Sequence, residues 1–191
     1  MSLKKQIIEQ IEDSITLKQT ILQSYIDPIE KCVEHFLQSL KNNGKIIFCG
    51  NGGSAADSQH LAAELVVRLR STYDRPAIPA IALTVNTSIL TAAGNDYGFD
   101  KIFARQIEAV GNVNDVLVAI STSGNSPNII EAVKTAREKN IFIIGFLGGN
   151  GGKLKSIVDL PIIVPSNTTA RIQETHIMIG HIVCHLVETE L

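Results

Sequence analysis

A histidine and a glutamate stand four residues apart in the first half of this 191-residue chain, at His60 and Glu64. Side chains at that spacing lie on one face of a helix. Small apolar residues surround the pair, so part of this helix is expected to be buried. An imidazole beside a carboxylate can transfer protons or bind a metal ion. A solvent-exposed His–Glu ion pair is the simpler alternative.

A second group of candidate residues lies near the C-terminus, at Gln173, His176, His181 and His185. Gln173 and His181 are eight residues apart on one helical stripe, and His181 and His185 are four apart, a spacing equally suited to a metal ion. Periodicity alone does not choose between these pairs. For His176 and His185, hydrogen-bonded packing on an apolar helix is the favoured interpretation.

Two turns of small polar residues each follow an apolar run. Cys49–Ser54 follows Lys45–Phe48, and Ser121–Ser126 follows Asp115–Ile120. Glycines let a ligand approach the backbone, and a following helix N-terminus favours an anion. Neither turn holds a lysine or arginine. The second turn lacks the Gly-Lys-Ser/Thr ending of a P-loop, and its glycine spacing does not match a dinucleotide fingerprint. The pattern predicts a single phosphate monoester rather than a polyphosphate.

Each turn also has a plainer explanation. Asn51-Gly52-Gly53 could be only a tight connection with Ser54 capping a helix, and Ser126-Pro127 is a typical helix start. A helix start does not account for the further hydroxyls of Ser121, Thr122 and Ser123. A third polar segment, Asn95-Asp96, follows a short helical stretch, and either caps a helix at a turn or hydrogen-bonds to sugar hydroxyls.

Alternating apolar runs and helical stretches are expected to position these residues. The expected strands are Ile46–Cys49, Ile78–Leu83, Val116–Ile120, Ile141–Phe146 and Ile162–Val164, and the expected helices lie near 53–70, 98–110, 127–139 and 168–189. Continuous apolar strands separated by helices indicate a parallel sheet covered on both faces. We therefore expect one α/β domain over residues 1–191, with a doubly wound, mostly parallel five-stranded sheet. Ligands of such folds bind at the carboxyl ends of the strands, where both turns fall.

Two amphipathic helices are expected before the first strand, within residues 1–43. Leu3, Ile7, Ile8, Ile11 and Ile15 form the apolar stripe of the first. Asp27-Pro28 is expected to begin the second. A domain of this size has limited core to cover, so we expect this segment to make oligomer contacts.

Composition excludes several classes of function. Hydrophobic residues make up 45% and charged residues 19% of the chain, and the net charge of −2 offers no general basis for binding nucleic acid or acidic membranes. The three widely spaced cysteines suggest reduced thiols in a cytosolic protein. The N-terminus lacks a signal-peptide pattern, and the longest apolar run, Ile141–Leu147, is too short to span a bilayer.

Taken together, these motifs closely resemble the phosphoheptose isomerases, within the wider sugar isomerase (SIS) domain family. Any one motif would be weak, but the set occurs in order, at compatible spacing, across nearly the whole chain. The segments that carry the resemblance are Cys49–His60 with Glu64, Gly94–Asp96, Ile120–Ser126, and Ala170–Glu174 with His176 and His181.

The resemblance implies a role for each matching residue. Glu64 and His181 would be the acid/base pair. In zinc-containing members, His60, Glu64, Gln173 and His181 match the metal ligands. The residues implied to contact substrate are Asn51, Gly52, Gly53, Glu64, Asn95, Asp96 and Gln173, with Ser121, Thr122, Ser123 and Ser126 holding the phosphate.

The implied reaction converts sedoheptulose 7-phosphate to D-glycero-D-manno-heptose 7-phosphate through an enediol, as the first step toward nucleotide-activated heptose. The heptose would enter lipopolysaccharide, capsule or another glycan. Zinc is the implied cofactor. The family also implies a cytoplasmic homotetramer with active sites at subunit interfaces, in which Glu64 and His181 of one site can come from different chains.

Three other functions are open at this point. Some SIS-domain relatives bind a replication initiator without catalysis, but those lose the catalytic Glu and His that Glu64 and His181 match here. A sugar-phosphate sensor is a second alternative, which the same two residues disfavour. An isomerase of another sugar phosphate is the third.

Overall fold

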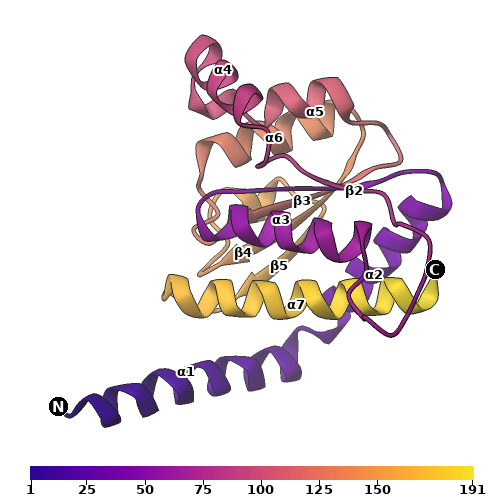
Figure 1. Ribbon diagram of the computed structural model, residues 1–191. Coiled ribbons are helices and arrows are strands. Elements are labelled where there is room, and N and C mark those ends of the chain that lie inside the picture. The colour runs from indigo at the N-terminus through magenta and orange to yellow at the C-terminus, as the bar shows by residue number, and fades with distance from the viewer.

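The computed structural model describes residues 1–191 and contains one five-stranded sheet in which every neighbouring pair is parallel (Figure 1). The spatial order is β2-β1-β3-β4-β5. The strands are β1 (Ile46–Gly50), β2 (Ala80–Ala82), β3 (Val116–Ser121), β4 (Phe142–Gly148) and β5 (Leu160–Val164). The expected doubly wound fold is confirmed.

The chain reverses its direction across the sheet between β1 and β3. From β1 it passes to β2 on one side, whereas β3, β4 and β5 follow one another on the other side. In the β1–β3 register, Gly50 lies opposite Ile120, so the two polar turns leave the sheet side by side. Such a switch point opens a crevice at the carboxyl ends of the strands, where ligands of doubly wound folds bind.

Helices cover both faces of the sheet. One core cluster packs the sheet against α1 (Leu3–Ser24), α2 (Ile26–Lys41), α3 (Gly53–Val66) and α7 (Thr169–Glu190). The other packs it against α4 (Thr87–Tyr97), α5 (Ala104–Val110) and α6 (Pro127–Glu138). Two short 3₁₀ helices, Phe99–Lys101 and Leu154–Ser156, lie in the connections.

Several expected boundaries were wrong. Strand pairing at β2 covers only Ala80–Ala82, because this strand lies at the edge of the sheet and pairs only with β1. Helix α3 ends at Val66 rather than near residue 70. At this end of the helix, Arg75 donates to the carbonyl oxygens of Glu64 and Leu65. The helix expected over 98–110 is divided, with a 3₁₀ turn before α5.

The start of the second helix also differs from expectation. Helix α2 begins at Ile26 with Tyr25 as N-cap, so Asp27 lies inside the first turn instead of capping it. An aspartate in the first turn still interacts favourably with the positive end of the helix dipole.

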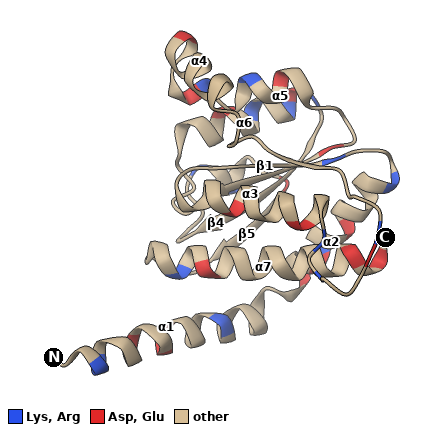
Figure 2. Cartoon of the chain, viewed as in Figure 1, with Lys and Arg blue, Asp and Glu red and all other residues tan.

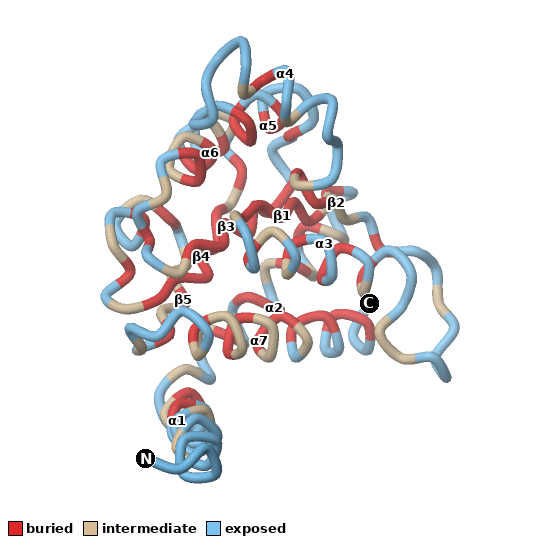
Figure 3. Tube along the Cα trace, turned by 60° about the vertical axis from the view of Figure 1, so that its left-hand side comes forward, coloured by how far each residue is buried: buried red, intermediate tan, exposed pale blue.

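Helix α1 extends away from the body of the molecule (Figures 1 and 3). Only Leu17 and Ile21 of this helix are buried. Ser14 ties it to α7 by donating to Glu174, 3.1 Å away. Its charged residues are of both signs (Figure 2), while its remaining apolar residues are exposed: Leu3, Ile7, Ile8, Ile11, Ile15 and Leu22. None of the helices combines the length and the apolar character needed to cross a membrane.

Candidate active site

Helices α3 and α7 bring His60, Glu64 and His181 together; we call these three residues the histidine cluster. The Nε2 atoms of His60 and His181 are 2.8 Å apart, and His60 Nε2 lies 3.1 Å from Glu64 Oε1. The ligand atoms of all three lie within 4.8 Å of one another. A single chain supplies both Glu64 and His181, so the expectation that they can come from different chains is not needed.

Close packing of the two helices explains this convergence. Gly180, next to His181, lies against Leu61, next to His60, and a Cβ added at Gly180 would lie 2.6 Å from both Leu61 methyl carbons. Only glycine allows this approach, since real Cβ contacts are longer. The cluster therefore depends on a residue whose contribution is the absence of a side chain.

The cluster combines burial with access. The His60 side chain is 51% exposed, whereas that of Glu64 is 17% exposed. Two imidazole nitrogens and one carboxylate oxygen form a three-ligand set that suits catalytic zinc with a position left open for substrate. Tetrahedral coordination would separate the two nitrogens to about 3.3 Å, given Zn–N distances of ~2.0–2.1 Å. The residues therefore fit a metal ion after a small movement of the rings.

Gln173, the fourth implied metal ligand, lies next to the first turn. Its side chain fills the space that a Cβ at Gly53 would occupy. Eight residues separate it from His181, a rise of roughly 12 Å along a helix. The Gln173 amide is thus beside a turn implied to bind substrate.

The other histidines of α7 have no place in the cluster. His176 is fully buried, and its Nε2 donates to the Leu147 carbonyl oxygen at 3.0 Å. Burial lowers the pKa of His176 to about 4, so the ring is neutral. His185 is exposed. The packing interpretation of His176 is therefore supported. Of His181 and His185, only His181 lies in the cluster, as the family resemblance implied.

The second turn, which we call the serine turn (Ser121–Ser126), forms a compact group of hydroxyls. The hydroxyls of Ser121 and Ser126 lie 3.0 Å apart. Ser126 is the N-cap of α6, with Pro127 in its first turn, as expected. Its side chain makes no capping bond, which leaves the hydroxyl available beside the helix N-terminus.

The loop Gly151–Leu154, which follows β4, packs against the serine turn. Gly124 has φ of 64°, and a Cβ there would overlap the Gly151 carbonyl. The Gly124 carbonyl accepts from Leu154 N at 3.0 Å, and Asn125 Oδ1 accepts from Lys153 N at 3.1 Å. Backbone contacts of this kind hold the turn rigidly, as binding of an anion by fixed groups requires.

A polar cavity of about 310 Å³ opens beside the serine turn. Sequence reasoning missed most of its lining. It is lined by Thr122, Ser123, Gly148, Gly149, Asn150, Ser166, Asn167, Thr169 and Ile172. The available signal was the run Ser166-Asn167-Thr168-Thr169, a third small polar turn between a strand and a helix.

Asp57 is a further residue that sequence reasoning did not single out. It precedes His60 by one helical turn, and its Oδ2 is buried without a hydrogen-bond partner. Burial raises the pKa of Asp57 to about 6, and nearby His60 acts in the opposite direction. Its i, i+3 spacing from His60 was the signal.

Asn95 and Asp96 are not brought to the histidine cluster by this chain. They lie in the last turn of α4, exposed, with Asn95 Nδ2 donating to Asp96 Oδ1 at 2.8 Å. Helix α4 packs on the opposite face of the sheet from α3 and α7. The segment is helical, so the turn considered from the sequence is absent.

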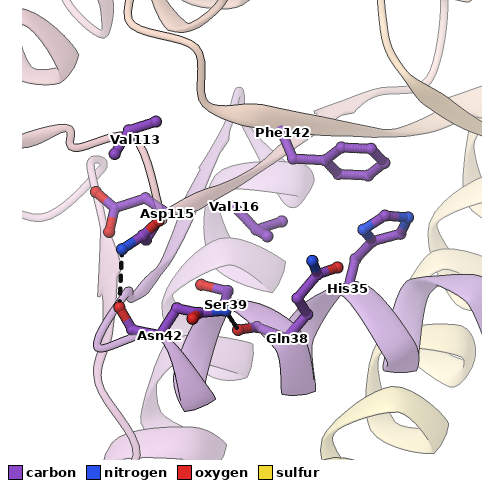
Figure 4. Close-up of a pocket in the computed structure, with 9 residues that line it drawn as sticks. His35, Gln38, Ser39, Asn42, Val113, Asp115, Val116 and Phe142 are labelled. Atoms are coloured by element: carbon purple, nitrogen blue, oxygen red, sulfur yellow. Dashed lines mark hydrogen bonds between the residues drawn. The ribbon is translucent and has the colours of Figure 1, made fainter.

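A cavity of about 240 Å³ lies at the other end of the sheet, where β3 and β4 begin (Figure 4). His35 stacks on Phe142 there, with ring centroids 3.7 Å apart. Asp115 accepts from Lys45 Nζ at 2.7 Å. None of the site residues expected from the sequence lines this cavity.

The SIS domain family model matches residues 10–148. The phosphoheptose isomerase of Clostridium acetobutylicum is 56% identical over 191 residues, covering 99% of this chain and 96% of that protein. That of Leptospira biflexa is 50% identical over 185 residues, covering 97% and 95%.

Solved structures are similar along the whole chain. The phosphoheptose isomerase of Neisseria gonorrhoeae superposes with a TM-score of 0.92 at 44% identity and covers 98% of this chain and 100% of that one. That of Francisella tularensis superposes with a TM-score of 0.95 at 37% identity, covering 99% and 100%.

Proposed function

The chain belongs to the phosphoheptose isomerases of the sugar isomerase (SIS) domain family, which are aldose–ketose isomerases, and we propose that it converts sedoheptulose 7-phosphate to D-glycero-D-manno-heptose 7-phosphate. The observation that carries the proposal is the histidine cluster, in which a partly buried carboxylate and two imidazoles converge between α3 and α7. A sugar phosphate isomerase needs proton-transferring groups, which the histidine cluster would supply, and an anion-binding turn, which the serine turn would supply.

The reaction requires two net proton transfers, one from C1 to C2 and one from the C1 hydroxyl oxygen to the C2 oxygen. Glu64 removes a proton from C1 of the ketose, and the C2 carbonyl oxygen gains a proton, which produces the enediol. Return of a proton to C2 and loss of the C1 hydroxyl proton then produce the aldose. His181 moves protons among the two oxygens, and its contact with His60 orients its ring. The serine turn holds the phosphate, which is bound but not transferred, so neutral hydroxyls and amides suffice.

We propose that the cluster also holds zinc, with His60, Glu64 and His181 as ligands; Gln173, the fourth ligand implied by the resemblance, lies beside Gly53 of the first turn. When bound there, zinc would polarise the carbonyl and hydroxyl oxygens of the substrate. The donor set and the 4.8 Å limit on its spread support this assignment. Because a carboxylate bound tightly to a metal is a poorer base, Glu64 would be held loosely while it accepts the proton.

The proposal includes a homotetramer with sites at subunit interfaces. Residues 1–191 would act as one SIS domain, with residues 1–43 as the oligomer contact. The exposed apolar stripe of α1 supports this, since an unpaired stripe of that length is typically covered by another surface. A neighbouring subunit could then supply Asn95 and Asp96, which this chain keeps on the opposite layer. We also propose a cytosolic location; the three free cysteines are all buried.

Incubating the purified protein with sedoheptulose 7-phosphate tests the proposal. Product is followed by NMR with and without a chelator, and light scattering gives the oligomeric state. Turnover that a chelator removes and zinc restores is expected. No turnover in either condition would refute the enzyme assignment, unchanged turnover with chelator would refute the metal, and a fully active monomer would refute the shared site.

The same assay separates the other candidates. Binding of sedoheptulose 7-phosphate without turnover would indicate a sensor. Faster turnover of a pentose or hexose phosphate would indicate an isomerase of another sugar phosphate. Neither binding nor turnover would favour a protein-binding SIS domain.

A further inference from the structure

A reciprocal pair of hydrogen bonds joins the first turn to the helix that follows the serine turn. Asn51 Nδ2 donates to Asn128 Oδ1 at 2.9 Å, and Asn128 Nδ2 donates to Asn51 Oδ1 at 2.8 Å. Asn128 lies in the first turn of α6 and is 1% exposed, whereas Asn51 is half-buried. The bridge crosses the switch point between β1 and β3, the crevice in which a ligand of this fold binds.

We propose that Asn128 is a positioning residue for the isomerisation and that it acts through the Asn51 amide. The inference rests on the proposed function, in which Asn51 contacts substrate. Asn128 itself is buried and is not assigned a contact with the substrate.

The physical basis is the amide's asymmetry. A side-chain amide carries an oxygen acceptor on one side and an N–H donor on the other, and half a turn exchanges them. In the pair, each amide commits one N–H and one oxygen lone pair. If the Asn51 amide alone rotated by half a turn, its oxygen would face the Asn128 oxygen and its nitrogen would face the Asn128 nitrogen. Both hydrogen bonds would then be lost. Asn128 therefore decides which group of Asn51 faces the crevice.

The bridge also sets a distance. Asn51 belongs to the turn that precedes α3, the helix that carries His60 and Glu64, and Asn128 follows the serine turn by two residues. Fixing one to the other holds the proton-transferring end and the phosphate-binding end of the substrate site in register. Misplacement of about 1 Å between such groups can lower a rate roughly 100-fold.

A double-mutant cycle tests the proposal. The variants are Asn128→Asp, Asn51→Ala and the two combined, with Asn114→Ala as a matched control. Asn128→Asp keeps the side-chain size and the acceptor for Asn51 Nδ2 but removes the donor to Asn51 Oδ1, so one of the two hydrogen bonds of the pair is lost. Asn114 also donates a side-chain hydrogen bond, to the Asn42 carbonyl oxygen at 2.9 Å, but it is exposed and lines the cavity at the opposite end of the sheet.

We expect Asn128→Asp to lower kcat for sedoheptulose 7-phosphate about tenfold, the effect of leaving one polar group unpaired, with KM changing less. In the Asn51→Ala background the same substitution should have almost no further effect. The inhibition constant of inorganic phosphate, a probe of the serine turn, should stay unchanged. Asn114→Ala should behave as wild type in all assays.

Independent effects of the two substitutions on kcat/KM would overturn the proposal, as would wild-type kinetics of Asn128→Asp. A rise in the phosphate inhibition constant equal to the loss of kcat/KM would also overturn it, because Asn128 would then act through the serine turn. A wild-type protein that binds sedoheptulose 7-phosphate without turnover would refute the enzyme assignment instead. In that case the double-mutant cycle would use dissociation constants of sedoheptulose 7-phosphate measured by calorimetry. Additive effects of the two substitutions on binding free energy would overturn the positioning role.

Discussion

The histidine cluster and the serine turn are built in different ways. The serine turn consists of consecutive residues, Ser121–Ser126, held mainly by backbone contacts to a neighbouring loop. The histidine cluster combines residues 121 positions apart, and its geometry depends on how α3 packs against α7. The comparison indicates that the proposed anion site is a local property of the chain, whereas the proposed proton-transferring site depends on tertiary packing.

The largest expected effect tests the chemical half of the comparison. Glu64→Gln removes the proposed base while keeping its size, so kcat for sedoheptulose 7-phosphate should fall about 10³-fold or more, within the range of general acid–base catalysis. Substrate binding by calorimetry and the circular dichroism spectrum should be retained. Glu138→Gln, an exposed change on α6, serves as control. Near-normal turnover of the Glu64 variant would remove the base assignment.

His176 connects the two regions, because its ring on α7 donates to Leu147, the residue opposite Ser121 in the β3–β4 register. Its pKa is lowered from 6.5 to about 4 in the folded protein, so the unfolded chain binds the proton first. The contribution of neutral His176 to the free energy of unfolding is fully present above pH 6.5 and is lost as the pH falls toward 4. Over that window it amounts to about 3 kcal/mol, at ~1.4 kcal/mol per pKa unit.

Urea unfolding between pH 4 and 7 measures this contribution. His176→Gln, whose amide can also donate to Leu147, should show a shallower decline in unfolding free energy toward acid. His185→Gln, exposed on the same helix, should decline as wild type does. Identical pH dependence of the His176 variant and wild type would contradict the linkage.

Gly180→Ala tests whether the histidine cluster depends on helix packing. The added methyl would overlap Leu61, so we expect a loss of about 1–3 kcal/mol in unfolding free energy, typical of overpacking. Zinc binding and turnover should weaken as His181 moves from His60. Gly94→Ala is the matched control, because the nearest atom to its Cβ is 3.8 Å away, and alanine favours a helix. Equal stability of the two variants would show that α7 can shift without loss.

The smallest expected effect concerns the serine turn. Ser126→Ala removes one hydroxyl of the pair with Ser121, and KM should rise about tenfold with kcat changed far less, since one hydrogen bond to a charged group contributes ~1.5–3 kcal/mol. Ser156→Ala removes an exposed hydroxyl bonded to the Lys153 carbonyl and should leave KM unaltered. A selective fall in kcat would mean that the two regions are not functionally distinct.

Much of the fold and part of the site could be read from the sequence. Apolar runs predicted all five strands, and the small polar residues after β1 and β3 predicted two turns at the carboxyl edge of the sheet, because both signals depend on neighbouring residues. The boundaries at β2 and α3 could not be predicted this way. They depend on sheet position and on Arg75, which reaches α3 from the following loop.

By itself, the sequence determined the serine turn and the shared helical face of His60 and Glu64, since spacing along one element suffices for both. Periodicity did not choose between His181 and His185; the resemblance named His181, and tertiary packing of α3 against α7 brings its ring to His60. Tertiary structure alone decided that Asn51 is held by Asn128, and that Asn95 and Asp96 lie on the other layer. These contacts join residues distant along the chain, and the helix and sheet packing that brings them together leaves no local pattern.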